Sequence, residues 1–384
     1  MSDFYLDYVD AMCSADTSSL YSSSFQDMVT LLHEVDADTT LTNIFGNHSG
    51  MAGLQKLFYD KLHKSRWSVF WSGITDPEET AWLTSLRGPH AGAWLEAYPK
   101  TKNFVIGNSE FQTMLCYRLH LAQSQIIAGS RCDCRHHPYL DRYGHHLITG
   151  CTKGGQRHRT HDSLKRELCS MMNYCGIWTK QEEVGIFRND DPNNNMRPDI
   201  SVLADPVTGS KIVMDVSITC PVPGAAGLGS TSSSPDDDGG ARTGLRRTGS
   251  VLTLDKAKDK GRAARTAAAA KLRKYDQLAR SNGLGFTPLI FESAGHMHED
   301  LLKVLKRAAQ HGEALRKVPW TKLMRFMVIG LSVSLQRGLA SAYLRKVAQV
   351  NGRLGLCTSR YNYELVNGYD RVHADDVPRH HLRG

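Results

Sequence analysis

The sequence predicts an α+β (α/β) protein whose central domain, residues 162–312, runs helix, strand, strand, strand, helix, strand. Three observations support this order. A stretch with apolar residues at helical spacing comes first. Short segments with the alternating pattern of strands follow it, two of them separated by a turn. A long Ala-rich helical stretch and one more apolar strand complete the domain.

The first helix is expected over residues 162–176. Its apolar positions recur every three or four residues, and Gly176 follows as a stop signal. These positions are Leu164, Leu168, Met171, Met172 and Cys175. Asp162 is a preferred N-cap residue, so His161 and Asp162 are expected to cap this helix. Trp178 to Phe187 is the first expected strand.

The next two strands are expected to form a hairpin with an acid on each arm. Asp199 precedes the apolar run 200–204, and residues 205–209, Asp-Pro-Val-Thr-Gly, supply the turn. In the run 212–219 side chains two apart share a face, so Asp215 lies opposite an apolar row. The long helix then covers about residues 263–279, and the last strand covers 286–292.

The two acids predict a divalent-metal site. Asp199 and Asp215 have fifteen residues between them and lie on adjacent strands of the predicted hairpin. Mg²⁺ needs only one or two protein carboxylates, because it keeps waters and takes phosphate oxygens from a substrate. Mn²⁺ is the alternative ion. A solvated turn Asp and a strand Asp facing water are the simpler interpretation of the same residues.

The element order and the acid motif resemble those of restriction-endonuclease-like nucleases, whose signature is Pro-Asp, a spacer, then Asp or Glu, any residue, Lys. Pro198-Asp199 and Asp215-Val216-Ser217 match it except at the last position, where Ser217 replaces the Lys. A wider set of residues occurs in the order seen in one family with this nuclease. The set is Cys132, Cys134, His146, Cys151, Arg157, Arg159, His161, Asp162, Glu183, Arg197, Asp199, Asp215, Lys271, Lys274 and Tyr275.

That family comprises non-LTR retrotransposon proteins, in which a Cys-Cys-His-Cys zinc knuckle precedes a restriction-like endonuclease. The resemblance covers roughly residues 80–340, and residues 85–95 resemble the linker before the knuckle. A Tyr-x-Asp-Asp polymerase segment is missing from the sequence, so we expect a fragment, a truncated element or a co-opted derivative.

The resemblance implies a Mg²⁺-dependent DNA endonuclease of the PD-(D/E)xK type. Asp199 and Asp215 would hold the metal, and Glu183 would be a third acid. A lysine of the long helix, Lys271 or Lys274, is expected to replace the missing motif Lys, with its nitrogen on the order of 3 to 6 Å from the Asp215 carboxylate. The alternatives are an inactive nucleic-acid-binding module, for which Ser217 argues, and a relic of a retroelement.

The knuckle candidates offer the four ligands of a closed structural zinc site. Cys132, Cys134 and Cys151 supply three thiolates, and His145 or His146 supplies the fourth ligand. His146 is preferred because four residues separate it from Cys151, the spacing usual for such knuckles. The single residue between the first two cysteines is tighter than the common gap. A His-rich basic loop with unrelated cysteines is the alternative.

Charge and cysteine usage suit an intracellular DNA-binding protein. The chain has 384 residues and a net charge of +8, yet residues 1–55 hold no Lys or Arg. Residues 131–166 carry eight Lys or Arg against three acids, and residues 241–280 carry twelve against three. Such basic blocks bind phosphates, so double-stranded DNA is the expected partner and RNA the second. Nine unevenly spaced cysteines favour a reducing compartment, nuclear or cytoplasmic.

The predicted organisation has five parts. They are an acidic region at 1–80, a linker region at 81–130, the knuckle at 131–161, the nuclease domain at 162–312 with a disordered insertion at about 223–262, and a C-terminal helical region at 313–384. The longest apolar run, Phe326 to Leu335, is too short to cross a bilayer, so no membrane association is expected.

Overall fold

The computed structural model describes residues 54–99, 104–123, 131–135, 139–151, 153–188, 196–222 and 252–353. The chain forms two compact units, Met1–Thr75 and Asp76–Gly384. In the first unit the described part contains helix α4. The described parts of the predicted linker, knuckle, nuclease and C-terminal regions all belong to the second unit. The expectations for residues 1–53, for 223–251 and for the tail from 354 lie outside the described residues.

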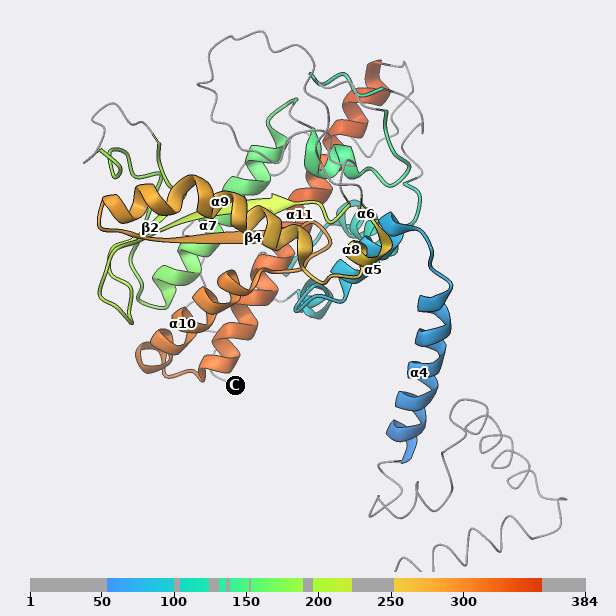
Figure 1. Cartoon of the computed structure of the whole chain (residues 1–384), viewed down its shortest axis with the longest axis horizontal. Helices are drawn as coiled ribbons and strands as arrows, with labels where there is room; N and C mark the ends of the chain where they lie inside the picture. Colours follow the sequence, from blue (N-terminus) through green and yellow to red (C-terminus); the bar gives the residue numbers. More distant parts are fainter. Residues whose placement is uncertain are drawn as a thin grey trace, which may run out of the picture. The chain divides into compact units, whose positions relative to one another are not determined.

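The described part is a mixed α+β structure with a four-stranded sheet (Figure 1). The helices are α4 (Leu54–Ser72), α5 (Pro77–Leu86), α6 (Asn108–Arg118), α7 (Gln156–Tyr174), α8 (Leu254–Ala257), α9 (Arg262–Ser281), α10 (Glu299–Arg316) and α11 (Trp320–Arg353), with a 3₁₀ turn at Ala93–Glu96 and a π-helical turn at His146–Gly150. The strands are β1 (Thr179–Gln181), β2 (Ile200–Val202), β3 (Ile212–Thr219) and β4 (Gly285–Glu292).

The sheet has the strand order β1-β2-β3-β4. Strands β1, β2 and β3 are antiparallel neighbours, and β4 runs parallel to β3 after the α9 crossover. The predicted hairpin is confirmed: Ile200 pairs with Met214, and the turn closes where the Gly209 N–H donates to the Asp205 carbonyl over 2.8 Å. The predicted order of one helix, three strands, a long helix and a fourth strand is present in the second unit, with the short helix α8 added before α9.

Strand β3 is buried on both faces, which explains its mostly apolar sequence. One face packs with α7, α10 and α11 in the main core, and the other packs with α9 (Figure 1). Met214 and Val216 belong to the main core. Val213 lies in a separate cluster with Tyr275 of α9. The face predicted to carry Asp215 is therefore covered by a helix.

Three sequence expectations differ from the structure. The strand expected over 178–187 ends at Gln181, because Glu182 adopts a positive φ of +48° and turns the chain out of the sheet. Residues 252–262, assigned to a disordered insertion, contain α8 and reach the start of α9. Helix α7 begins at Gln156, six residues before Asp162, so His161 and Asp162 lie inside the helix and the expected cap is wrong.

The apolar run Phe326 to Leu335 lies within helix α11, which has 34 residues and is therefore longer than the run itself. The segment Trp320–Val350 is long and apolar enough to cross a membrane, and it is the one helix in the described part with this length and composition. Of its most apolar window, 67 % is buried within the protein. Its apolar residues pack with α7 and α10 in the main core.

A backbone contact after β4 gives a stability prediction. Gly295 has φ +104°, and a Cβ added there would lie 2.5 Å from the carbonyl oxygen of Ala91. Gly295→Ala is therefore expected to lower the free energy of unfolding by about 3 kcal/mol. Alanine disfavours the positive φ, and its Cβ would clash with the Ala91 carbonyl oxygen. Gly283→Ala is the matched control, because Gly283 also has positive φ (+68°) but open space around it, and about 1 kcal/mol is expected. Equal losses in urea denaturation would contradict the role of the Ala91 contact.

Candidate functional site

Four buried side chains form a cluster with the geometry of a metal site. The ligand atoms of Cys132, Cys134, His146 and Cys151 all lie within 4.8 Å of one another. The Cys132 and Cys151 Sγ atoms are 3.7 Å apart, and Cys134 Sγ is 3.4 Å from His146 Nε2. Two thiolates on a tetrahedral zinc ion, with Zn–S bonds of about 2.3 Å, are about 3.8 Å apart. The cluster could therefore hold a metal such as zinc, as predicted.

Backbone hydrogen bonds hold the second half of this cluster in place. The Asp141 carboxylate accepts from the backbone N–H groups of Tyr143, His145 and His146 over 3.0, 3.0 and 3.2 Å. A π-helical turn then brings the Cys151 N–H to 2.8 Å from the His146 carbonyl. This π-helical turn connects His146 to Cys151, and both side chains belong to the cluster. Asp141 is a positioning residue that the sequence analysis did not identify.

The structure decides between the two candidate histidines. His145 Nδ1 lies 3.1 Å from the Tyr117 hydroxyl, which is in turn 3.1 Å from the Ser293 hydroxyl. This buried network ties the knuckle segment to the turn after β4, and it engages His145 Nδ1 outside the four-residue cluster. His146 is therefore the fourth member of the cluster, in agreement with the choice made from spacing.

Burial shapes the chemistry of the thiols. It raises the pKa of Cys132 to about 12, with the neighbouring Cys151 acting in the same direction. A buried thiolate is disfavoured unless a cation compensates its charge. A bound divalent metal would provide that charge, and the thiols would release their protons when it binds.

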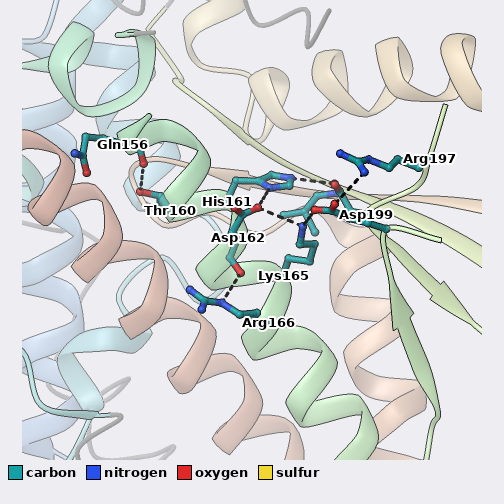
Figure 2. Close-up of polar contacts among 10 residues, drawn as sticks. Gln156, Thr160, His161, Asp162, Lys165, Arg166, Arg197 and Asp199 are labelled. Carbon is teal, nitrogen blue, oxygen red and sulfur yellow. Dashed lines mark hydrogen bonds and ion pairs between the residues drawn. The ribbon is translucent and has the colours of Figure 1, made fainter. Parts of the chain in front are cut away.

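A second group of polar residues gathers at the two predicted acids. The Asp199 carboxylate accepts from the Val216 N–H of β3 over 2.7 Å, which ties the entry of β2 to the middle of β3. The same oxygen, Oδ2, lies 2.9 Å from His161 Nε2. Figure 2 shows His161 reaching from α7 to Asp199. Sequence reasoning missed this contact because it placed His161 at a helix cap.

The charge state of His161 follows from these neighbours. Burial lowers its pKa, but the hydrogen bonds to Asp199 and Asp162 and the negative charge of Asp199 outweigh burial, so the pKa is raised. Asp162 also pairs with Lys165 over 3.2 Å, and Lys165 contacts Glu182. The Arg197 guanidinium lies 3.5 Å from the Glu182 carboxylate. A series of alternating charges therefore extends from Asp199 through His161 and Asp162 to the buried Lys165 of α7.

Asp215 is paired with a lysine of α9. Lys271 Nζ lies 2.7 Å from Asp215 Oδ2, and the two side chains are only 9 % and 7 % exposed. Burial raises the pKa of Asp215, and the negative charge of Asp199 raises it further. The Lys271 ammonium lowers it, but the pKa remains raised. The two carboxylates lie on neighbouring chain segments, because Ile200 pairs with Met214 and Asp199 accepts from the Val216 N–H. The expected approach of a lysine nitrogen to Asp215 is present, and Lys271 makes it.

Lys274 and Glu183 have other partners. Lys274 Nζ lies 4.9 Å from the centre of the Tyr275 ring. Glu183 pairs with Lys211 over 2.9 Å and with Lys180 over 3.3 Å. Among the described residues, the ion pairs of Glu183 are with these two lysines and do not include the groups that contact Asp199 and Asp215.

Comparison of the chain with protein-family models, curated proteins and solved structures gives no match. The class that the structure defines is a mixed α+β protein with a buried Cys₃His cluster and a separate pair of acids at its sheet.

Proposed function

We propose that this chain is a metal-dependent DNA endonuclease of the restriction-like type, related to the nucleases of non-LTR retrotransposons. The observation that carries the proposal is the convergence of Asp199, Asp215 and Lys271. They come from the entry of β2, from β3 and from α9, and Lys271 Nζ lies 2.7 Å from Asp215. The element order around them, α7-β1-β2-β3-α9-β4 with α8 before α9, supports a restriction-endonuclease-like core. The preceding Cys₃His cluster supports the zinc knuckle of that family.

The donor set fits Mg²⁺ or Mn²⁺. Two neighbouring carboxylates are the protein ligands that Mg²⁺ ordinarily takes, with waters and phosphate oxygens completing its shell. The ion would activate a water and stabilise charge on the scissile phosphate. Asp215 must be ionised for this, and the Lys271 ammonium favours its charged form against burial.

Lys271 is the proposed replacement for the motif lysine, whose position in the sequence is occupied by Ser217. Ser217 follows Asp215 by two residues on β3, as the motif lysine would, but it has no charge. A long lysine side chain from α9 reaches the same carboxylate. A preorganised ammonium beside the acids would stabilise the negative charge that develops on the phosphate.

A plasmid-nicking assay of the purified chain tests the proposal. Supercoiled DNA is incubated with Mg²⁺, with Mn²⁺ or with EDTA, and open-circular and linear products are measured. We expect nicking with either metal and none with EDTA. DNA binding in EDTA, without cleavage under any metal, would replace the endonuclease with a binding module.

The two lysines of α9 provide a matched pair of variants. Lys271→Met is expected to lower the nicking rate by about 10²- to 10³-fold, because it removes a charge from the reacting center. Lys274→Met removes the same charge one turn away and is expected to change nicking less than about tenfold. DNA affinity, measured by fluorescence anisotropy in EDTA, should change little in either variant. Equal losses of nicking in both would contradict the assignment of Lys271.

A non-catalytic nucleic-acid-binding module is the second candidate. It is favoured by Asp199, whose Oδ2 already accepts from the Val216 N–H and contacts His161. It is also favoured by the ion pair that occupies Asp215. Double-stranded DNA is the proposed partner in both cases, with RNA as the second, and a decayed retroelement product would show neither cleavage nor selective binding.

A further inference from the structure

The start of helix α7 is an uncapped, positively charged helix end. Gly154 and Gly155 precede it with φ of +84° and +68°. No side chain caps its first turn, and that turn contains no acid but does contain Arg157. The free N–H groups and the dipole of a helix make its N-terminus partially positive. A glycine-rich loop that leads into such an end is a common phosphate-binding arrangement.

A buried lysine points at this helix end from α11. Lys346 is 1 % exposed, and its Nζ makes neither a hydrogen bond nor an ion pair with any residue that the structure describes. The Nζ atom lies 3.3 Å from the position that a Cβ on Gly154 would occupy. An ammonium buried without an anion is unfavourable, and the positive end of α7 makes it more so. An anion bound between the Lys346 ammonium and the start of α7 would stabilise both of these positive groups.

The packing of α11 against α7 fixes the position of Lys346 relative to the start of α7. Thr160 of α7 lies against Gly338 of α11, where an added Cβ would meet Thr160 Cγ2 at 2.6 Å. One turn further along α11 toward its start, the hydroxyls of Ser163 and Ser334 are 3.3 Å apart. The two helices therefore run antiparallel with a fixed register, and this register places Lys346 opposite Gly154.

We propose that a phosphate group of a nucleic-acid backbone binds at this site, between Lys346 and the N–H groups that begin α7, with Arg157 at its edge. The choice of nucleic acid rests on the proposed function. His161 follows Gln156 by five residues on the same helix (Figure 2), which is roughly 8 Å along its axis. Along the axis of a duplex, this distance corresponds to about two base-pair steps at ~3.4 Å each. One strand could therefore pass from this phosphate site to Asp199.

Lys346→Met is the central test, with Lys322→Met as its control. Lys322 lies on the same helix and is exposed, so the control makes the same charge change away from the site. DNA affinity is measured in EDTA at several salt concentrations, so cleavage is not required. Lys346→Met is expected to weaken binding by about tenfold and to lower the salt slope by about one, while the control changes little. Without ligand its Tm should stay equal or rise, because a buried unpaired charge is removed.

Free phosphate separates the nucleic-acid site from a general anion site. Inorganic phosphate, compared with chloride at equal ionic strength, is expected to raise the Tm of the parent protein but not of Lys346→Met. A phosphate effect on Tm with an unchanged DNA salt slope would overturn the nucleic-acid assignment. A lower ligand-free Tm with an unchanged slope, seen also for Lys346→Gln, would make Lys346 a structural lysine and overturn the site. Absence of nicking with Mg²⁺ would count against the nuclease alone, since these readouts use no cleavage.

Discussion

Replacing Cys151 with Ala is expected to release the metal of the Cys₃His cluster and to disorder residues 131–151. The parent protein should contain about one equivalent of zinc, measured by mass spectrometry of the digested protein. Structural zinc contributes apparent binding free energies of about 10–16 kcal/mol in small zinc domains. The segment joins a larger core here, so we expect a loss of about 3 kcal/mol or more in the free energy of unfolding. A strong chelator should have the same effect on the parent protein.

Two controls make this result specific. Cys169 is also a buried cysteine, but it lies on α7 outside the cluster, so Cys169→Ala should keep its zinc. His145→Gln should keep zinc as well, whereas His146→Gln should lose it, because His145 contacts Tyr117 instead. Metal-free parent protein with protected amides over 139–151 would show that hydrogen bonds to Asp141 suffice to hold the segment.

Asp199→Asn and Asp215→Asn are each expected to reduce nicking by about 10³-fold or more, since each removes a charged ligand of the proposed Mg²⁺ site. DNA binding in EDTA should stay within a few-fold of the parent. Asp215→Asn should also be less stable, by about 1–3 kcal/mol, because it leaves the Lys271 ammonium buried without its anion. The free energy of unfolding and the nicking rate therefore have to be measured on the same preparations.

Glu183→Gln is the matched control for the two acids. Its partners are Lys211 and Lys180, so a small change in nicking is expected. A loss as large as that of Asp199→Asn would restore Glu183 as the third acid implied by the family resemblance. Full activity in either Asp variant would rule out the proposed metal site.

Short-range patterns predicted much of the fold. The alternation over 212–219 and the turn at 205–209 predict the hairpin that the structure contains, because strand period and turn chemistry are local properties. The Ala-rich stretch and the strand after it became α9 and β4. The segment 178–187 failed as a strand because the positive φ at Glu182 is a backbone choice that apolar periodicity does not report.

The sequence by itself determined the three cysteines of the cluster, its preferred histidine and the two acids of the hairpin, because residue type and spacing along the chain limit which side chains can meet; the contact of His145 with Tyr117 then decided for His146. Only the tertiary structure decided which lysine reaches Asp215 and that His161 reaches Asp199. Lys271 and Lys274 differ by one turn, and the packing of α9 on β3 selects between them. His161 meets Asp199 because α7 starts at Gln156 and lies against the sheet. These contacts join segments far apart in the chain, so their partners are set by how whole elements pack.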